Sequence, residues 1–309
     1  MTHSPTAALR EGDVTVDARL PRLSSACAPL TRCVSAVNAW GETVPSTIPC
    51  ERALTVYVDK REVVTLMTLG MQPELLVMGY LRNQRLVQSV GDVESITVDW
   101  DTGAAAVKTR SGIADLAERM AQRVITTGCG QGSVFASAMD AVDRIQLPAS
   151  RLHQRELYAL VDCIRVQDSI YKQAGSVHGC ALFHGAKLLV FVEDVGRHNA
   201  VDTIAGWMGL HGVDGGDKVL YTTGRLTSEM VIKSAHMGVP IVVSRSGITE
   251  MGLSVAERLG LCAIGRATHR RFLCFTAPER LELQPVLAGA RAASGQDPWA
   301  PRDPVTALR

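Results

Sequence analysis

The stretch KVLYTTGRLTSEMVIKSAHMGVPIVVSRSG, residues 218–247, decides the fold. Its two short apolar runs, 218–222 and 241–244, are typical of strands buried on both faces of a sheet. Between them, residues 228–237 have the spacing of a helix, and Ser228 stands at its start. A strand, a helix and a second strand in this order predict two parallel strands joined by a crossover helix.

The same alternation continues on both sides of this stretch. We expect further helices at 199–208 and 249–259 and a strand at 261–265. A helix within 149–173, capped by Ser150, and a hairpin formed by 179–183 and 187–192 precede them. The chain is therefore predicted to contain an α/β domain over residues 149–283.

The N-terminal part follows a different pattern. Residues 53–58 and 62–66 predict one hairpin and residues 96–100 and 104–109 a second, with a helix at 73–83. We therefore expect a smaller β-rich subdomain over residues 42–148. Residues 1–41 and 284–309 show no periodicity and are predicted to be a flexible N-terminal extension and a flexible tail.

Charge and composition exclude several classes of protein. The chain has 309 residues with 32 Lys+Arg against 31 Asp+Glu, a formal charge of +1, which argues against a nucleic-acid-binding protein. No apolar run approaches the ~18 residues of a membrane span, and no secretory signal is visible. Eight scattered cysteines suit reduced thiols, so we expect a cytoplasmic protein.

Polar residues follow three of the predicted strands. Each of these segments combines an arginine with hydroxyl, amide or glycine residues, a mixture suited to phosphate because arginine forks and helix N-termini both bind anions. Carboxyl ends of parallel strands meet at one edge of a sheet, which predicts a shared anion site. The alternative is that these residues only cap helices and pair with one another. The segments are Arg197, His198 and Asn199; Thr223, Gly224 and Arg225; and Ser244, Arg245 and Ser246.

A fourth basic segment follows the last predicted strand. It contains Arg266, His269, Arg270 and Arg271, and no acidic residue occurs between Glu257 and Glu279. This uncompensated charge is predicted to face the same site, and a solvated basic surface is the alternative.

The segment TTGCGQGS, residues 126–133, differs from the rest because three glycines surround Cys129. A thiol on such a loop can react with one partner and then reach another, whereas a plain glycine turn is the alternative. No Cys-x-x-Cys, zinc deaminase signature or Walker loop occurs in the chain, so we expect no metal site and no P-loop chemistry.

Several motifs in order resemble the formate dehydrogenase accessory protein family, FdhD. The resemblance covers about residues 45 to 283 and includes Gly79-Tyr80-Leu81 and the stretch 93–96 in the N-terminal part. The longer motifs are EDVGRHNAVD (193–202), TGR (223–225) with SEMV (228–231) and Lys233, GVP (238–240), SRS (244–246) and PERL (278–281).

The resemblance implies a sulfur carrier of sulfurtransferase type, whether or not it counts as an enzyme. Such proteins accept sulfur as a persulfide from a cysteine desulfurase and pass it to molybdenum bis(molybdopterin guanine dinucleotide), the cargo that then enters formate dehydrogenase. It also implies a cytidine deaminase-like α/β sandwich domain, a cytoplasmic homodimer, and binding of GDP or GMP as partial mimics of the cargo.

The resemblance assigns roles to particular residues. Cys129 matches the sulfur-bearing cysteine. Residues 265–272 match a C-terminal segment that binds the cargo, which adds Ala267 and Thr268 to Arg266, His269, Arg270 and Arg271. Gly132 stands where the family has a second cysteine, so sulfur transfer would run through Cys129 alone. This departure keeps open a cofactor-binding chaperone that carries no sulfur, and a hydrolase acting on nucleotides is a third possibility.

Overall fold

A computed structural model describes residues 20–114, 116, 142 and 144–284. Its residues form two compact units that are interleaved along the chain. The first unit comprises the described residues of 1–139 together with 169–180 and 192–214, and the second comprises those of 140–168, 181–191 and 215–309. The predicted boundary at residue 149 follows chain order only and stays a prediction.

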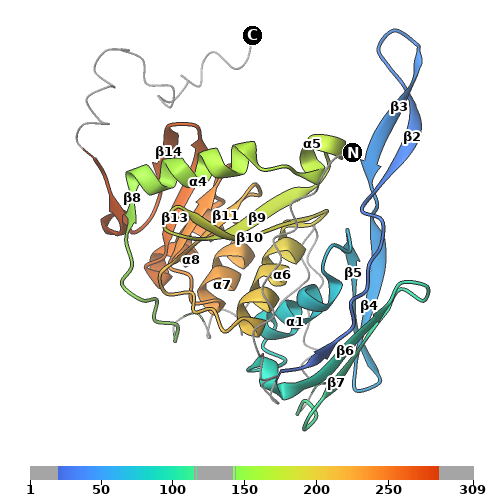
Figure 1. The fold of residues 1–309 in the computed structure, drawn as a ribbon. Coiled ribbons are helices and arrows are strands. Elements are labelled where there is room, and N and C mark those ends of the chain that lie inside the picture. The colour runs from blue at the N-terminus through green and yellow to red at the C-terminus, as the bar shows by residue number, and fades with distance from the viewer. Residues whose placement is uncertain (1–19, 115, 117–141, 143, 285–309) are drawn as a thin grey trace, which may run out of the picture. The chain divides into compact units, whose positions relative to one another are not determined.

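The first unit is built on a mixed five-stranded sheet with the order β1-β6-β7-β4-β5 (Figure 1). The two predicted hairpins are confirmed in this sheet, because β4 pairs antiparallel with β5 and β6 with β7. The predicted helix is confirmed as α1, which buries Leu76, Val77 and Leu81 against the apolar face of the sheet. The elements are β1 (Arg22–Leu23), β4 (Arg52–Val58), β5 (Arg61–Thr68), α1 (Pro73–Asn83), η1 (Val90–Asp92), β6 (Val93–Asp99) and β7 (Ala104–Thr109).

Helix α6 (Arg197–Leu210) packs closely against α1 in the same unit. A Cβ atom at Gly79 would lie 1.6 Å from the carbonyl oxygen of Asp202, and one at Gly206 would lie 2.0 Å from that of Leu75. The two backbones are therefore nearly in contact, which only glycine permits at these positions. Across this contact, Asn83 Nδ2 donates to Asp202 Oδ1 at 2.7 Å.

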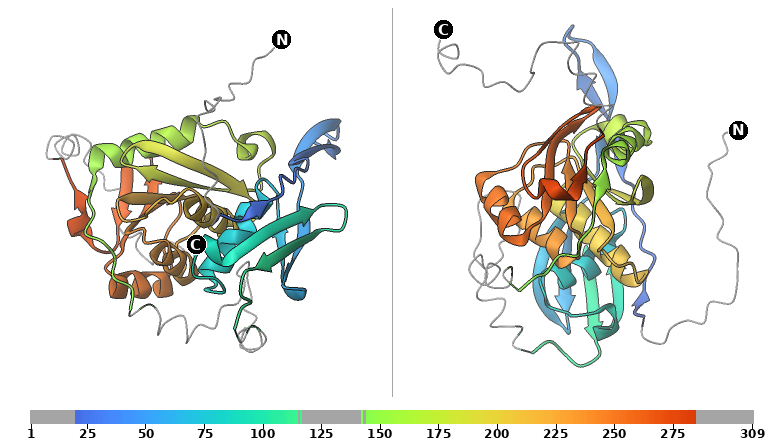
Figure 2. Two further views of the ribbon diagram at one scale, coloured as in Figure 1. Left: turned by 60° about the horizontal axis from the view of Figure 1, so that its bottom comes forward. Right: turned by 90° about the vertical axis from the view of Figure 1, so that its left-hand side faces the viewer.

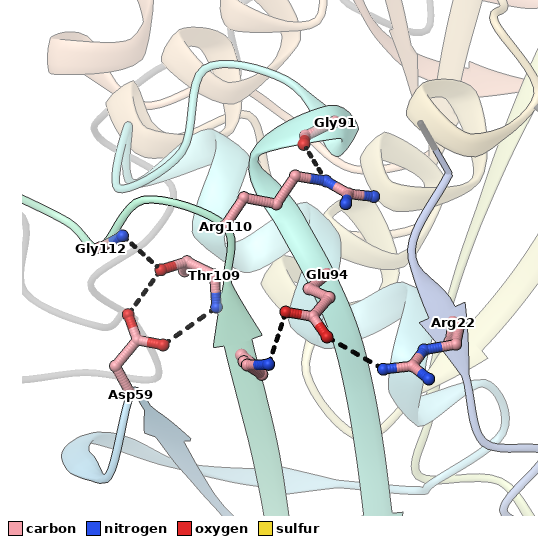
Figure 3. A network of polar contacts seen from close by, with 8 residues as sticks. Arg22, Asp59, Gly91, Glu94, Thr109, Arg110 and Gly112 are labelled. Carbon is pink, nitrogen blue, oxygen red and sulfur yellow. Dashed lines mark hydrogen bonds and ion pairs between the residues drawn. The ribbon is translucent and has the colours of Figure 1, made fainter. Parts of the chain in front are cut away.

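Polar contacts hold one end of the five-stranded sheet together (Figure 3). Thr109 donates to Asp59 from its hydroxyl at 2.6 Å and from its backbone N–H at 3.0 Å. Glu94 on β6 lies 3.0 Å from Arg22 on β1 and 2.7 Å from Lys108 on β7. These ion pairs lower the pKa of Glu94, chiefly through the hydrogen bond from Lys108. They connect three neighbouring strands of the sheet.

The second unit contains the alternating elements predicted from residues 218–247. Strands β11, β12 and β13 are parallel, and they belong to a six-stranded sheet with the order β10-β9-β11-β12-β13-β14. Helix α4 covers one face of this sheet, while α7 and α8 lie on the other (Figure 2). The elements are β8 (Leu152–His153), α4 (Gln154–Val166), β11 (Lys218–Thr222), α7 (Ser228–His236), β12 (Ile241–Ser244), α8 (Glu250–Leu259), β13 (Cys262–Thr268), β14 (Arg271–Cys274), η2 (Pro278–Arg280) and β15 (Leu281–Glu282).

The predicted hairpin at 179–192 is present as β9 (His178–His184) and β10 (Lys187–Asp194), and each of these strands has residues in both units. The single helix expected within 149–173 is instead two helices, α4 and α5 (Ile170–Ala174). The expected cap, Ser150, does not start α4. Residues 152–153 pair with β15 as a strand, and His153 is the N-cap, its backbone N–H donating to Glu156.

Residues 31–37, predicted from the sequence to belong to an extension without periodicity, form strand β2 (Thr31–Val37). It pairs along its whole length with β3 (Thr43–Pro49). Most side chains of β2 are exposed, so burial leaves no alternating pattern in the sequence. Among the described helices, none is long and apolar enough to cross a membrane.

Candidate functional site

Three of the predicted ligand segments lie side by side in the second unit. The ends of β11 and β12 are in register, with Thr222 opposite Ser244. Ser244 Oγ donates to the carbonyl oxygen of Gly224 at 2.6 Å, and the Arg245 N–H donates to that of Thr222 at 3.0 Å. The Arg266 N–H in turn donates to the carbonyl oxygen of Ser246 at 2.7 Å, which joins the third segment to the second.

Arg225, Arg245 and Arg266 are the charged residues at this edge. Arg225 and Arg245 follow the ends of β11 and β12, and Arg266 lies within the last turn-side residues of β13, the next parallel strand. All three arginines are exposed, whereas Thr222 and Ser244 are fully buried. Among the described residues, no carboxylate lies within ion-pair distance of Arg225 or Arg245. Arginine side chains spaced along one sheet edge can bind the oxygens of a diphosphate bidentately. The anion site predicted from the sequence stays a prediction.

The backbone at Arg266 has a conformation that non-glycine residues rarely adopt. Its φ is 52°, and the pairing of β13 with β14 is irregular between Gly265 and Thr268. Such strain persists only where the surroundings fix it, and it is concentrated at functional sites. Here the hydrogen bond from the Arg266 N–H to Ser246 O holds the backbone in this conformation, and Arg266 takes no part in the regular pairing of β13 with β14.

The remaining residues of the basic segment differ from one another. His269 and Arg271 are exposed at the turn between β13 and β14. Arg270 instead lies 3.0 Å from Asp162 of α4 and 4.9 Å from the ring centroid of Tyr158, so its charge is compensated within the fold. Ala267 is 1% exposed, packs in the core, and can contact a ligand only through its backbone. Thr268 is half-buried.

The segment Arg197–Asn199 begins α6 and belongs to the first unit. Asn199 is 5% exposed, and its amide donates to Met67 O at 2.7 Å and to Asp194 Oδ1 at 3.0 Å. Both amide hydrogens are therefore used inside the protein, as in the alternative that these polar residues pair with one another. His198 is also buried, and Arg197 is half-buried. Their predicted role in ligand binding stays a prediction.

Asp194 is the centre of this buried network and was not among the site residues predicted from the sequence. Its carboxylate accepts hydrogen bonds from Thr68 Oγ1 at 2.5 Å, Asn199 Nδ2 at 3.0 Å, and the N–H groups of Gly196 and Leu69. Burial raises the pKa of Asp194, and these four hydrogen bonds partly oppose the increase. The carboxylate joins the end of β5 to the start of α6. The sequence signal for this role is an aspartate two residues before a glycine that directly precedes a helix.

Two further charged residues have structural partners that only the fold reveals. Lys233 on α7 is 3% exposed, and its Nζ lies 3.8 Å from Glu229 Oε1 one turn earlier. Arg280 donates to the carbonyl oxygens of Gly260 at 2.9 Å and Pro148 at 2.5 Å. Arg280 thereby connects the start of the second unit to the loop that follows α8.

Cys129 and Gly132 lie outside the described residues, so their predicted roles are not tested by the structure. Within the described ranges, no group of three or more His, Cys, Asp or Glu side chains is arranged to hold a metal ion.

The model of the FdhD/NarQ family matches residues 49–282 of the sequence. The chain belongs to the FdhD/NarQ family. The match contains the strand ends, the basic segment and the Cys129 loop, which carried the resemblance in the sequence.

Relatives in the family agree with this membership. The chain is 32% identical over 234 residues to the sulfur carrier protein FdhD of Halalkalibacterium halodurans, covering 75% of this chain and 87% of the relative. It is 31% identical over 232 residues to that of Bacillus subtilis, covering 75% and 88%. A solved structure described as a formate dehydrogenase accessory protein, from Desulfotalea psychrophila, superposes with a TM-score of 0.66 at 26% identity and covers 82% of this chain and all of that one.

Proposed function

We propose that this FdhD/NarQ protein is a sulfur carrier that supplies formate dehydrogenase with a sulfurated cofactor. The observation that carries the proposal is that relatives named sulfur carrier protein FdhD are about 30% identical over three quarters of the chain. The residues of the predicted anion site support it, because three of the four segments are adjacent in the second unit.

Cys129 is the proposed sulfur carrier. Its thiolate attacks the terminal sulfur of a cysteine desulfurase persulfide, and the sulfur–sulfur bond of the donor breaks. The desulfurase cysteine leaves as a thiolate, Cys129 holds the persulfide, and no net oxidation occurs. Release of the outer sulfur as sulfide breaks the sulfur–sulfur bond on Cys129 and needs two electrons. Because Gly132 replaces the second cysteine, an external low-molecular-weight thiol supplies them: it attacks Cys129 Sγ, the outer sulfur leaves to the cargo, and a second such thiol reduces the mixed disulfide to free Cys129.

The proposed cargo is molybdenum bis(molybdopterin guanine dinucleotide). Its diphosphate groups carry the charge that Arg225, Arg245 and Arg266 can bind, and GDP or GMP should occupy the same residues as partial mimics. We further propose that the second unit is cytidine deaminase-like, which its parallel strands covered by helices on both faces support. The homodimer and the cytoplasmic location are proposed from the resemblance alone.

A chaperone that binds the cargo but carries no sulfur is the second candidate, and the glycine at position 132 favours it. The two functions differ in how formate dehydrogenase activation responds to Cys129→Ala. A strain that lacks its own FdhD should be complemented by the parent protein and not by this variant, while both proteins bind GDP equally. Full complementation by Cys129→Ala would refute sulfur carriage and leave the chaperone.

A further inference from the structure

A pair of cysteines outside the Cys129 loop lies within the second unit. Cys262 is on β13 and Cys274 is on β14, the antiparallel neighbour at the edge of the sheet. Their Sγ atoms are 3.8 Å apart, within hydrogen-bond distance for sulfur, and both are free thiols. Two thiols in contact on neighbouring strands can be joined by a disulfide if the strands shift slightly.

The two thiols have different surroundings. Cys262 is fully buried among the apolar side chains beneath α4, whereas Cys274 is half-buried. The hydrogen bond to Cys274, followed by burial, raises the pKa of Cys262 well above its ordinary value, and the same hydrogen bond lowers the pKa of Cys274. Cys274 is therefore the thiol that ionises first and that a small reagent reaches.

We propose that Cys262 and Cys274 form a redox-active dithiol whose substrates are low-molecular-weight disulfides of the glutathione class. The Cys274 thiolate attacks one sulfur of the small disulfide, and the other half leaves as a thiolate. Cys262 then loses its proton and attacks Cys274 Sγ, which releases the second small thiol. Two electrons pass from the protein to the small disulfide, and the protein gains one internal disulfide.

The strand register indicates that this disulfide is reversible rather than structural. Cys274 lies opposite Ile264, so Cys262 is its diagonal neighbour. Diagonal neighbours have Cα atoms roughly 7–8 Å apart, whereas bridged cysteines usually lie at about 4.4–6.8 Å. Closing the bond requires β14 to shift against the hydrogen bonds that Phe275 N–H donates to Ala263 O and Thr276 Oγ1 donates to Leu261 O. A disulfide that holds such a shift is strained and readily reduced.

Oxidation of this pair has a consequence for the neighbouring loop. The strands that it joins also carry Arg266 and the turn at His269. A shift of β14 toward Cys262 would move this turn. Neither Cys129 nor the cargo takes part in this reaction, so its test is independent of whether the protein carries sulfur.

Trypsin cleavage places Cys262 and Cys274 in different peptides. Cys262 is the single cysteine of the peptide 259–266, and Cys274 is the single cysteine of 272–280. The full-length protein is incubated with oxidised glutathione, the remaining thiols are alkylated, and the digest is analysed by mass spectrometry without reduction. We expect a cross-linked pair of these peptides, and we expect excess reduced glutathione to remove it.

Three variants make the assignment specific. Cys262→Ala and Cys274→Ser should each abolish the cross-linked pair completely, and in Cys262→Ala the peptide 272–280 should retain one glutathione. Cys163→Ala on α4 is the matched control and should cross-link like the parent. Because Cys274 is half-buried, Cys274→Ser tests the proposal even if Cys262→Ala folds poorly. Absence of the cross-linked pair in the folded parent, or its persistence in excess reduced glutathione, would overturn the proposal.

Discussion

Replacing Gly79 with alanine tests the contact between α1 and α6 most severely. The new Cβ would lie 1.6 Å from the carbonyl oxygen of Asp202, and contacts below 3.0 Å essentially never occur, so the helices must separate by about 1.4 Å. That movement would stretch the 2.7 Å hydrogen bond from Asn83 to Asp202 and the 2.8 Å bond from Arg82 to the Ala205 carbonyl oxygen beyond useful distances.

The free energy follows from these losses. Overpacking costs about 1–3 kcal/mol, and a buried polar group left without a partner costs about 1–3 kcal/mol. Alanine returns about 1 kcal/mol through its better helix propensity. The net loss of unfolding free energy is therefore about 3 kcal/mol, which corresponds to a Tm roughly 6–12 °C lower for a chain of this size.

Thermal unfolding followed by circular dichroism measures this effect. Gly247→Ala is the control, because a Cβ there meets no atom within 4 Å. A Gly79→Ala protein that melts within 2 °C of the parent, to an accuracy of about 1 °C, would refute the close packing of these helices.

Three further predictions concern charged residues. The raised pKa of Asp194 means that the folded state favours the protonated carboxyl. The stability of the parent relative to Asp194→Asn should therefore fall as the pH rises from below the pKa of an unfolded aspartate, about 4, through the pKa of Asp194 in the folded protein. Urea unfolding of both proteins at several pH values measures this, and a stability difference that does not change with pH contradicts it. Arg266→Ala should weaken GDP binding about 10-fold or more by calorimetry, while Arg258→Ala on α8 should not. Arg270→Ala should leave GDP binding unchanged and lower stability by about 1–2 kcal/mol, since it removes the exposed pair with Asp162 and the contact with the Tyr158 ring. A loss of binding equal to that of Arg266→Ala would show that Arg270 binds the ligand.

The elements that the sequence predicted well are those with strong burial patterns. Strand β11 and helix α1 have the predicted bounds, because their apolar residues follow one period and clear turn signals border them. Strand β2 was not predicted, since its partner is a single strand and most of its side chains are exposed. The break between α4 and α5 was also missed. The side chain of Glu193 on β10 accepts hydrogen bonds from the N–H groups of Ile170 and Tyr171, the first residues of α5. The start of α5 therefore depends on a residue more than twenty positions later in the chain.

Some residues of the candidate site could likewise be predicted from the sequence, and others could not. Arg225, Arg245 and Arg266 could be grouped from the sequence because the order of alternating strands and helices brings the carboxyl ends of parallel strands to one edge. Periodicity could not separate Arg270 from them, since its pairing with Asp162 depends on how α4 crosses the sheet. The partners of Asp194 and Asn199 were likewise inaccessible, because Met67 and Thr68 lie more than a hundred residues earlier in the chain.

Sulfur loading of Cys129 tests the central proposal most directly. The protein is incubated with a cysteine desulfurase and cysteine, and its tryptic peptides are analysed by mass spectrometry without reduction. Peptide 124–144 contains Cys129 as its single cysteine. Sulfur carriage predicts one added sulfur atom on this peptide, lost on treatment with a reductant and absent from Cys129→Ala. If the added sulfur is found on other cysteines and never on this peptide, Cys129 is not the carrier.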